Sequence, residues 1–203
     1  MGPDDIATPI FPKVSGHAAQ NFESEAGRVR NHGSALEARE LLKSRGYNPD
    51  DFHFWSVERE PLDKCLSHYS MMRFSPDHAR FRVTRPRTIL SQYPILNWTT
   101  YVLRRNFPLD DVRLTDAAGN RAVDTILRYE SLSSDLPNLL EMLGVKGFQL
   151  SATAKAGFRG GPQPKVHKWH VARIYKSFEA SSRNTGYSKS DADLTLHRIS
   201  GRA

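Results

Sequence analysis

The chain has 203 residues, of which 38% are hydrophobic, and a formal charge of +7 from 29 basic and 22 acidic side chains. It contains no run of about 18 apolar residues and no basic-then-apolar leader, so we expect no membrane span and a cytoplasmic setting. The single cysteine, Cys65, rules out an internal disulfide and a thiolate metal site. The excess positive charge suits nucleic acid, a polyanionic substrate or a phosphorylated small molecule.

Residues 1–22 are expected to form a loop, because several prolines and Gly16 interrupt any regular pattern. A helix is predicted to follow Ser34, since Glu37 lies three residues later and the two form a capping-box signature. Gly46 ends this helix, because glycine favours the position after a last helical turn.

A strand that turns into a helix is predicted next. Residues 53–57 are a short aromatic and apolar run typical of a strand. Pro61 suits the first position of a helix. Arg59 lies in the turn between the two elements, where backbone N–H groups and the helix dipole favour an anion, and Ser67 lies on the helix. One apolar face of this helix consists of Leu62, Leu66 and Tyr69.

The run REPLDKCLSHY, residues 59–69, resembles the 3′-phosphate-binding motif of bacterial PAPS-dependent sulfotransferases (PAPS is 3′-phosphoadenosine 5′-phosphosulfate). In that family an arginine ends a strand and a serine follows eight residues later. The resemblance implies that Arg59 and Ser67 hold the 3′-phosphate of PAPS, the sulfuryl donor, and that no metal takes part. The alternative is an ordinary turn with a surface arginine.

The resemblance implies an α/β fold, in which a parallel sheet is flanked by helices as in P-loop nucleotide kinases. It covers residues 1–187, followed by a polar tail at 188–203 that we expect to be frayed. The family's first strand and its loop for the 5′-phosphosulfate are missing, and the Pro12-Lys13 pair does not fit that loop. We therefore expect an incomplete, truncated domain that is weakly active or inactive.

Two further sites follow from the resemblance. His32, just before the capped helix, occupies the place of a candidate general base that takes the proton from the acceptor hydroxyl. Arg159 and Gly160 lie in a glycine-rich basic segment similar to the family's late 3′-phosphate loop. The alternatives are a histidine that only precedes a helix, and a solvated basic surface.

The remaining elements are predicted from local patterns. The arginine-rich segment at residues 71–87 is interpreted as a solvated loop rather than an acceptor site. The string VDTILRYE resembles a late strand of the family, with Arg128 and Glu130 expected as a strand-end ion pair. The other expected elements are a helix at 88–106, a turn at 109–120, a strand at 123–129, a helix capped by 133–135, a helix at 165–179 and a Gly186-Tyr187 signature.

The function predicted from the resemblance is transfer of a sulfuryl group from PAPS to a hydroxyl acceptor, whether small molecule, carbohydrate or lipid. A second hypothesis is a non-catalytic nucleotide- or anion-binding module. A third, less favoured, is a basic nucleic-acid binder, which would show a steep dependence of affinity on salt.

Overall fold

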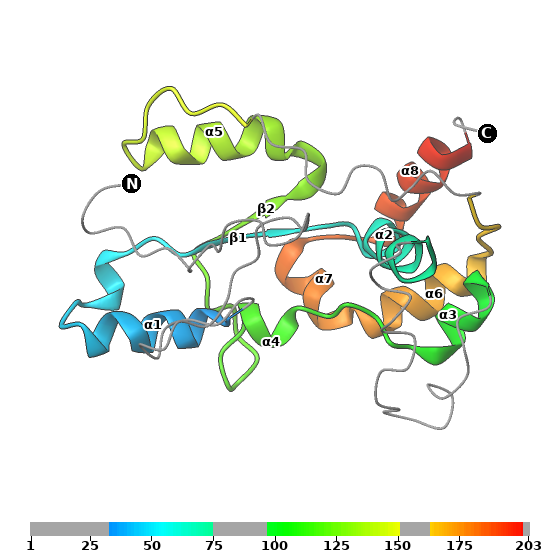
Figure 1. Ribbon diagram of the computed structural model, residues 1–203, viewed down its shortest axis with the longest axis horizontal. Helices are drawn as coiled ribbons and strands as arrows, with labels where there is room; N and C mark the ends of the chain where they lie inside the picture. Colours follow the sequence, from blue (N-terminus) through cyan, green and yellow to red (C-terminus); the bar gives the residue numbers. More distant parts are fainter. Residues whose placement is uncertain (1–32, 75–96, 151–162, 201–203) are drawn as a thin grey trace, which may run out of the picture. The chain divides into compact units, whose positions relative to one another are not determined.

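The computed structural model describes residues 33–74, 97–150 and 163–200, and the chain divides into two compact units. Unit 1 comprises Met1–Ser56 and Asp110–Thr125, and unit 2 comprises Val57–Leu109 and Ile126–Ala203. Figure 1 labels the helices and strands of both units.

Unit 1 contains short helices, of which α1 (Ala35–Ser44) contacts α4 (Asp111–Leu114). Helix α1 (Ala35–Ser44) begins with the predicted capping box, in which the Ser34 hydroxyl accepts the Glu37 N–H and the Glu37 carboxylate accepts the Ser34 N–H. The chain leaves this helix through Gly46 at a φ of 83°, a conformation that glycine adopts without strain. The 3₁₀ turn η1 (Pro49–Asp51) and helix α4 (Asp111–Leu114) follow along the chain.

Two short strands, β1 (Trp55–Glu58) and β2 (Thr125–Arg128), pair as a small parallel sheet flanked by helices. β2 lies within its predicted range and β1 extends one residue past the range 53–57, so the mixed α and β character is confirmed. Directly before β1, the Phe54 main-chain N–H donates to the Asp124 carboxylate at 2.7 Å. This bond ties the start of the first strand to the start of the second.

Unit 2 contains most of the helical structure. Its longest helix, α2, packs against helices α6 and α8, and α3 packs against α6 (Figure 1). The 3₁₀ turn η4 (Tyr129–Ser131) joins β2 to α5. The helices of this unit are α2 (Pro61–Phe74), α3 (Trp98–Arg104), α5 (Leu132–Met142), α6 (Lys168–Ser177), α7 (Glu179–Thr185) and α8 (Lys189–Ser200).

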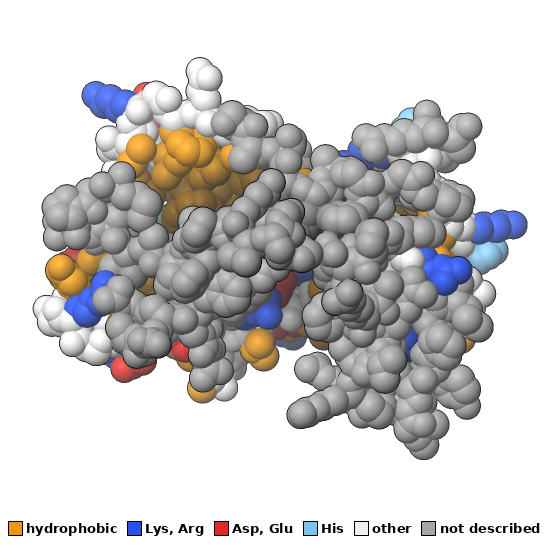
Figure 2. Space-filling model, in the orientation of Figure 1, with side chains coloured by type: hydrophobic (Ala, Val, Ile, Leu, Met, Phe, Trp, Pro, Cys, Tyr) orange, Lys and Arg blue, Asp and Glu red, His pale blue; other side chains and the backbone are white. Residues whose placement is uncertain are grey.

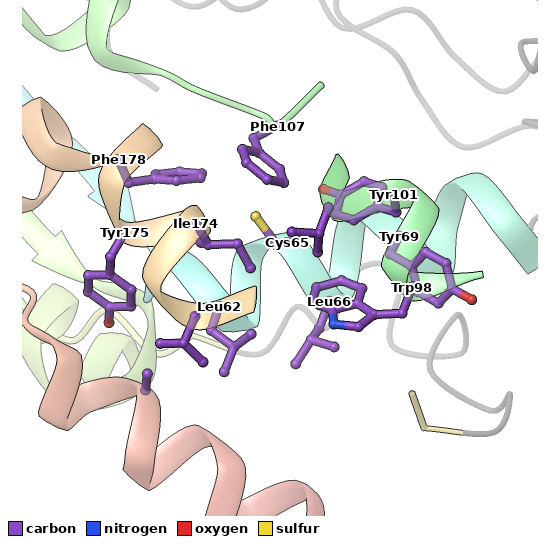
Figure 3. Packing of buried hydrophobic residues seen from close by; sticks show 13 residues of the cluster. Leu62, Cys65, Leu66, Tyr69, Trp98, Tyr101, Phe107, Ile174, Tyr175 and Phe178 are labelled. Atoms are coloured by element: carbon purple, nitrogen blue, oxygen red, sulfur yellow. The ribbon is translucent and has the colours of Figure 1, made fainter. Parts of the chain in front are cut away.

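The core of unit 2 is aromatic and lies between α2, α3 and α6 (Figure 3). Trp98 stacks on Tyr101 with ring centroids 5.3 Å apart, and Tyr69 meets Trp98 edge-on. Cys65 is fully buried among these rings, and burial raises the pKa of its thiol. The labelled members are Leu62, Cys65, Leu66, Tyr69, Trp98, Tyr101, Phe107, Ile174, Tyr175 and Phe178.

Hydrophobic side chains also reach the surface of unit 2. They gather over α5 in Figure 2. The exposed apolar residues at the end of α5 and in the segment that follows are Met142, Leu143, Val145, Phe148 and Leu150.

Several predicted elements differ from the structure. The prediction of a frayed tail is wrong for residues 189–200. These residues form α8, in which Ala192 and Thr195 are completely buried. The single helix expected at 165–179 is instead α6, after which the chain turns at Phe178 into α7. Of the helix expected at 88–106, α3 accounts for the last part, while residues 88–96 lie outside the described ranges.

Candidate functional site

The turn between β1 and α2 carries Arg59, the residue on which the sequence prediction rests. Its guanidinium pairs with the Asp63 carboxylate on the first turn of α2. The same guanidinium lies over the Tyr129 ring, 4.3 Å from the ring centroid, in a cation–π contact. The side chain remains 23% exposed, so it is partly accessible to solvent.

Ser67 lies on α2, one helical turn after Asp63, and is half-buried. Residues four apart share one face of a helix, so Asp63 and Ser67 lie on the same side of α2. Because Arg59 pairs with Asp63, the arginine reaches the helix face that carries Ser67. The predicted cation and hydroxyl therefore lie on one side of the strand–helix unit.

The start of α2 does not offer free N–H groups, and this part of the prediction is wrong. The Glu60 carboxylate caps the helix and accepts the N–H groups of Leu62 and Asp63, both at 2.8 Å. These are donors that a helix leaves unpaired at its N-terminus. An anion at this turn would therefore meet side chains rather than the first N–H groups of the helix.

Glu60 is 1% exposed and accepts four hydrogen bonds. Besides the two N–H groups of α2, it accepts the hydroxyls of Tyr175 at 2.7 Å and Thr195 at 2.8 Å. Burial raises the pKa of this carboxyl, and the four donors oppose that shift. One carboxylate thus joins the start of α2 to α6 and α8.

Glu58, the last residue of β1, is also buried. Its carboxylate pairs with the Lys64 ammonium at 2.7 Å and accepts the Arg59 main-chain N–H at 2.8 Å. The cost of burying the charge is offset by the cation and by the hydrogen bond. Arg59 is therefore flanked on both sides by buried carboxylates that fix the backbone of the turn.

The end of β2 supports the same turn from the other strand. The Glu130 carboxylate accepts the Glu60 main-chain N–H at 3.0 Å and the Tyr187 hydroxyl. The Tyr187 hydroxyl also lies 3.2 Å from the main-chain oxygen of Glu58. Burial and the neighbouring Glu130 raise the pKa of Tyr187, so this phenol stays protonated and can donate.

The prediction that Arg128 pairs with Glu130 is wrong. Arg128 pairs instead with Asp191 at 3.2 Å and donates to the main-chain oxygen of Gly186 at 2.9 Å. Its guanidinium lies 4.5 Å from the centroid of the Tyr187 ring. The Gly186-Tyr187 signature thus has a structural role, since it docks the end of α7 on β2.

The other predicted site residues, His32, Arg159 and Gly160, lie outside the described residues. Reasoning from sequence missed Glu60, Tyr175 and Thr195. The only local signal was a glutamate directly before a proline at a helix start, a place where carboxylates often cap. Tyr175 and Thr195 lie 115 and 135 residues away, which no local pattern reveals.

Within the described ranges, no group of three histidine, cysteine or acidic side chains is arranged to hold a metal ion. Among the helices of those same ranges, none has the length and apolar character needed to cross a bilayer. No family model, curated protein or solved structure matches the chain.

Proposed function

We propose that the β1–α2 turn binds the 3′-phosphate of PAPS and that the protein is a sulfotransferase of the P-loop nucleotide-kinase-like fold. The observation that carries the proposal is the position of Arg59 at the strand end with Ser67 eight residues later on α2. The proposed reaction is transfer of a sulfuryl group to a hydroxyl of a small molecule, carbohydrate or lipid.

The side chains of the turn fit a phosphate in part. Arg59 supplies a cation that is still accessible, and Ser67 supplies a hydroxyl on the same side of α2. Asp63 opposes binding, because its carboxylate already pairs with Arg59. A phosphate would therefore have to compete with Asp63, and the affinity depends on that competition.

The proposed roles divide between binding and proton transfer. Arg59 and Ser67 hold and orient the nucleotide, and Arg159 and Gly160 are proposed to add contacts to the same phosphate. His32 takes the proton from the acceptor hydroxyl as the sulfuryl group moves. PAPS, when bound, supplies the activated sulfuryl group.

Titration calorimetry with 3′-phosphoadenosine 5′-phosphate and with AMP tests the nucleotide site. The first ligand carries the 3′-phosphate and should bind more tightly. Arg59→Ala should lose about 2–4 kcal/mol of binding free energy, because a charge-assisted contact loses one partner. Ser67→Ala should also weaken binding, whereas Arg45→Ala and Ser133→Ala, at exposed positions outside the turn, should not. Equal affinity for the two ligands would contradict the proposal.

The second candidate is a nucleotide-binding module without catalysis. It is favoured by the Arg59–Asp63 pair and by the Glu60 cap, because both satisfy the turn without a ligand. A sulfate-transfer assay with radiolabelled PAPS and a panel of hydroxyl acceptors separates the two candidates. Turnover that falls in His32→Ala with unchanged nucleotide affinity supports the enzyme. Nucleotide binding without transfer to any acceptor supports the module.

A further inference from the structure

A pocket of about 660 Å³ opens between α6, α7 and the start of α8. Its volume is in the range of pockets that hold small molecules. Neither Arg59 nor Ser67 is among the described residues that line it. The lining residues are Ala172, Tyr175, Lys176, Glu179, Ser182, Arg183, Tyr187, Ser188 and Lys189.

The charged residues of the pocket are unbalanced. Three cations line it, namely Lys176, Arg183 and Lys189, against one carboxylate, Glu179. All four are exposed, and in the described part of the chain none of the three cations takes part in a hydrogen bond or ion pair. In the turn described above, by contrast, Arg59 and Lys64 each have a carboxylate partner. The pocket thus offers cationic side chains that have no acidic partner among the described residues.

The wall of the pocket contains a buried hydroxyl without a partner. The Ser182 Oγ is inaccessible to solvent and makes no hydrogen bond within the described residues. A buried polar atom of this kind is unfavourable unless something pairs with it. Because this hydroxyl has no accessible surface, it can pair with a ligand oxygen only after its side chain rotates into the pocket.

The two tyrosines of the wall offer rings rather than hydroxyls. The Tyr175 hydroxyl is bonded to Glu60, and the Tyr187 hydroxyl is bonded to Glu130. Their phenol groups are therefore occupied, and Ala172 adds a methyl group to the same wall. This wall suits an apolar or aromatic body, while the cations suit an acidic group.

We propose that this pocket binds a small molecule that consists of an aromatic or apolar body and one acidic group, a carboxylate, sulfate or phosphate. The acidic group pairs with Lys176, Arg183 or Lys189, and the body packs on the tyrosine rings. Because the described lining of this pocket includes neither Arg59 nor Ser67, either proposal can fail while the other holds.

The probes are 2-naphthyl sulfate, 2-naphthyl phosphate and the neutral 2-naphthol, titrated into the full chain by calorimetry. Both acidic probes should bind at least about ten times more tightly than 2-naphthol, because only they can pair with the cations. Arg183→Gln and Lys189→Gln should each weaken the acidic probes by about three- to tenfold. Lys146→Gln, a matched change at an exposed lysine of the same unit, should have no effect.

Two further variants sharpen the test. Glu179→Gln should tighten binding of the acidic probes by about threefold, because it removes the one opposing charge. Ser182→Ala should weaken binding without lowering the melting temperature, because the hydroxyl has no internal partner to lose. Equal affinity for 2-naphthol and 2-naphthyl sulfate would overturn the proposal. So would an equal loss of affinity in Lys146→Gln and Arg183→Gln, or no binding of the acidic probes at millimolar concentration.

Discussion

The two units are stabilised in different ways. In unit 1 most polar contacts are exposed, such as the capping box of α1 and the Arg39–Asp50 ion pair, in which the aspartate is 82% exposed. In unit 2 an aromatic core surrounds α2, and buried carboxylates bond residues more than a hundred positions apart. Exposed ion pairs contribute little to stability, whereas removal of one partner of a buried network is costly. We therefore expect mutations of polar residues to act strongly in unit 2 and weakly in unit 1.

Removal of the Glu60 carboxylate should have the largest effect. Glu60→Ala leaves two N–H groups of α2 and the hydroxyls of Tyr175 and Thr195 without their acceptor. We expect a loss of about 3 kcal/mol in the free energy of unfolding, because several buried donors lose their partner together. Urea denaturation of both proteins at pH 7 measures this loss. A loss below that of Ser34→Ala would contradict the importance of the buried network.

Glu60 also gives a test by pH. Because its pKa is raised in the folded state, its stabilising contribution is complete below the pKa of the unfolded chain and is lost as the pH rises through the raised value. Glu60→Gln does not titrate. The stability of the parent protein relative to this variant should therefore fall as the pH rises above about 4.5. A difference that stays constant with pH would show that the carboxyl is not perturbed.

Protonation of His170 in acid should lower the free energy of unfolding by a similar or smaller amount than Glu60→Ala does. Its ring is fully buried, and its Nδ1 accepts the His167 main-chain N–H at 2.9 Å, which caps α6. Burial, with a smaller contribution from His167, lowers its pKa to about 4, so protonation is opposed in the folded state. Stability should fall by about 2–3 kcal/mol as the pH decreases from 6.5 towards 4. Thermal unfolding across this range, compared with His170→Gln, measures it; the variant should lack this part of the pH dependence.

The smallest effect is expected in unit 1. Ser34→Ala removes the hydroxyl that accepts the Glu37 N–H and should cost about 1 kcal/mol, the usual cost of losing a helix cap. Circular dichroism during urea denaturation detects it. Glu37→Gln keeps a side-chain acceptor for the Ser34 N–H and should cost less. A loss as large as that of Glu60→Ala would remove the contrast between the two units.

Local signals predicted both ends of α1 and the start of α2. The Ser34 and Glu37 pair, Gly46 and Pro61 each marked an element end, because caps and prolines act on their immediate neighbours. The α8 helix was missed, because its buried face includes Thr195, a polar residue whose burial depends on its bond to Glu60. Such a bond exists only after the chain has folded.

The candidate site was predictable to a similar degree. The aromatic run at residues 53–57 and Pro61 indicated the strand and the helix on either side of Arg59, and both elements were found. The sequence did not indicate that Asp63 would pair with Arg59 or that Glu60 would cap α2. Charge pairing at a turn depends on side-chain directions that residue spacing does not fix.

The burial of Cys65 has a practical consequence. It is the only cysteine of the chain and has no exposed surface, and burial raises the pKa of its thiol. A thiol reagent needs the accessible thiolate, so it should react only when the helices around Cys65 separate. The rate of labelling of the unmodified protein therefore reports how often the core of α2, α3 and α6 opens, with no need to introduce a probe.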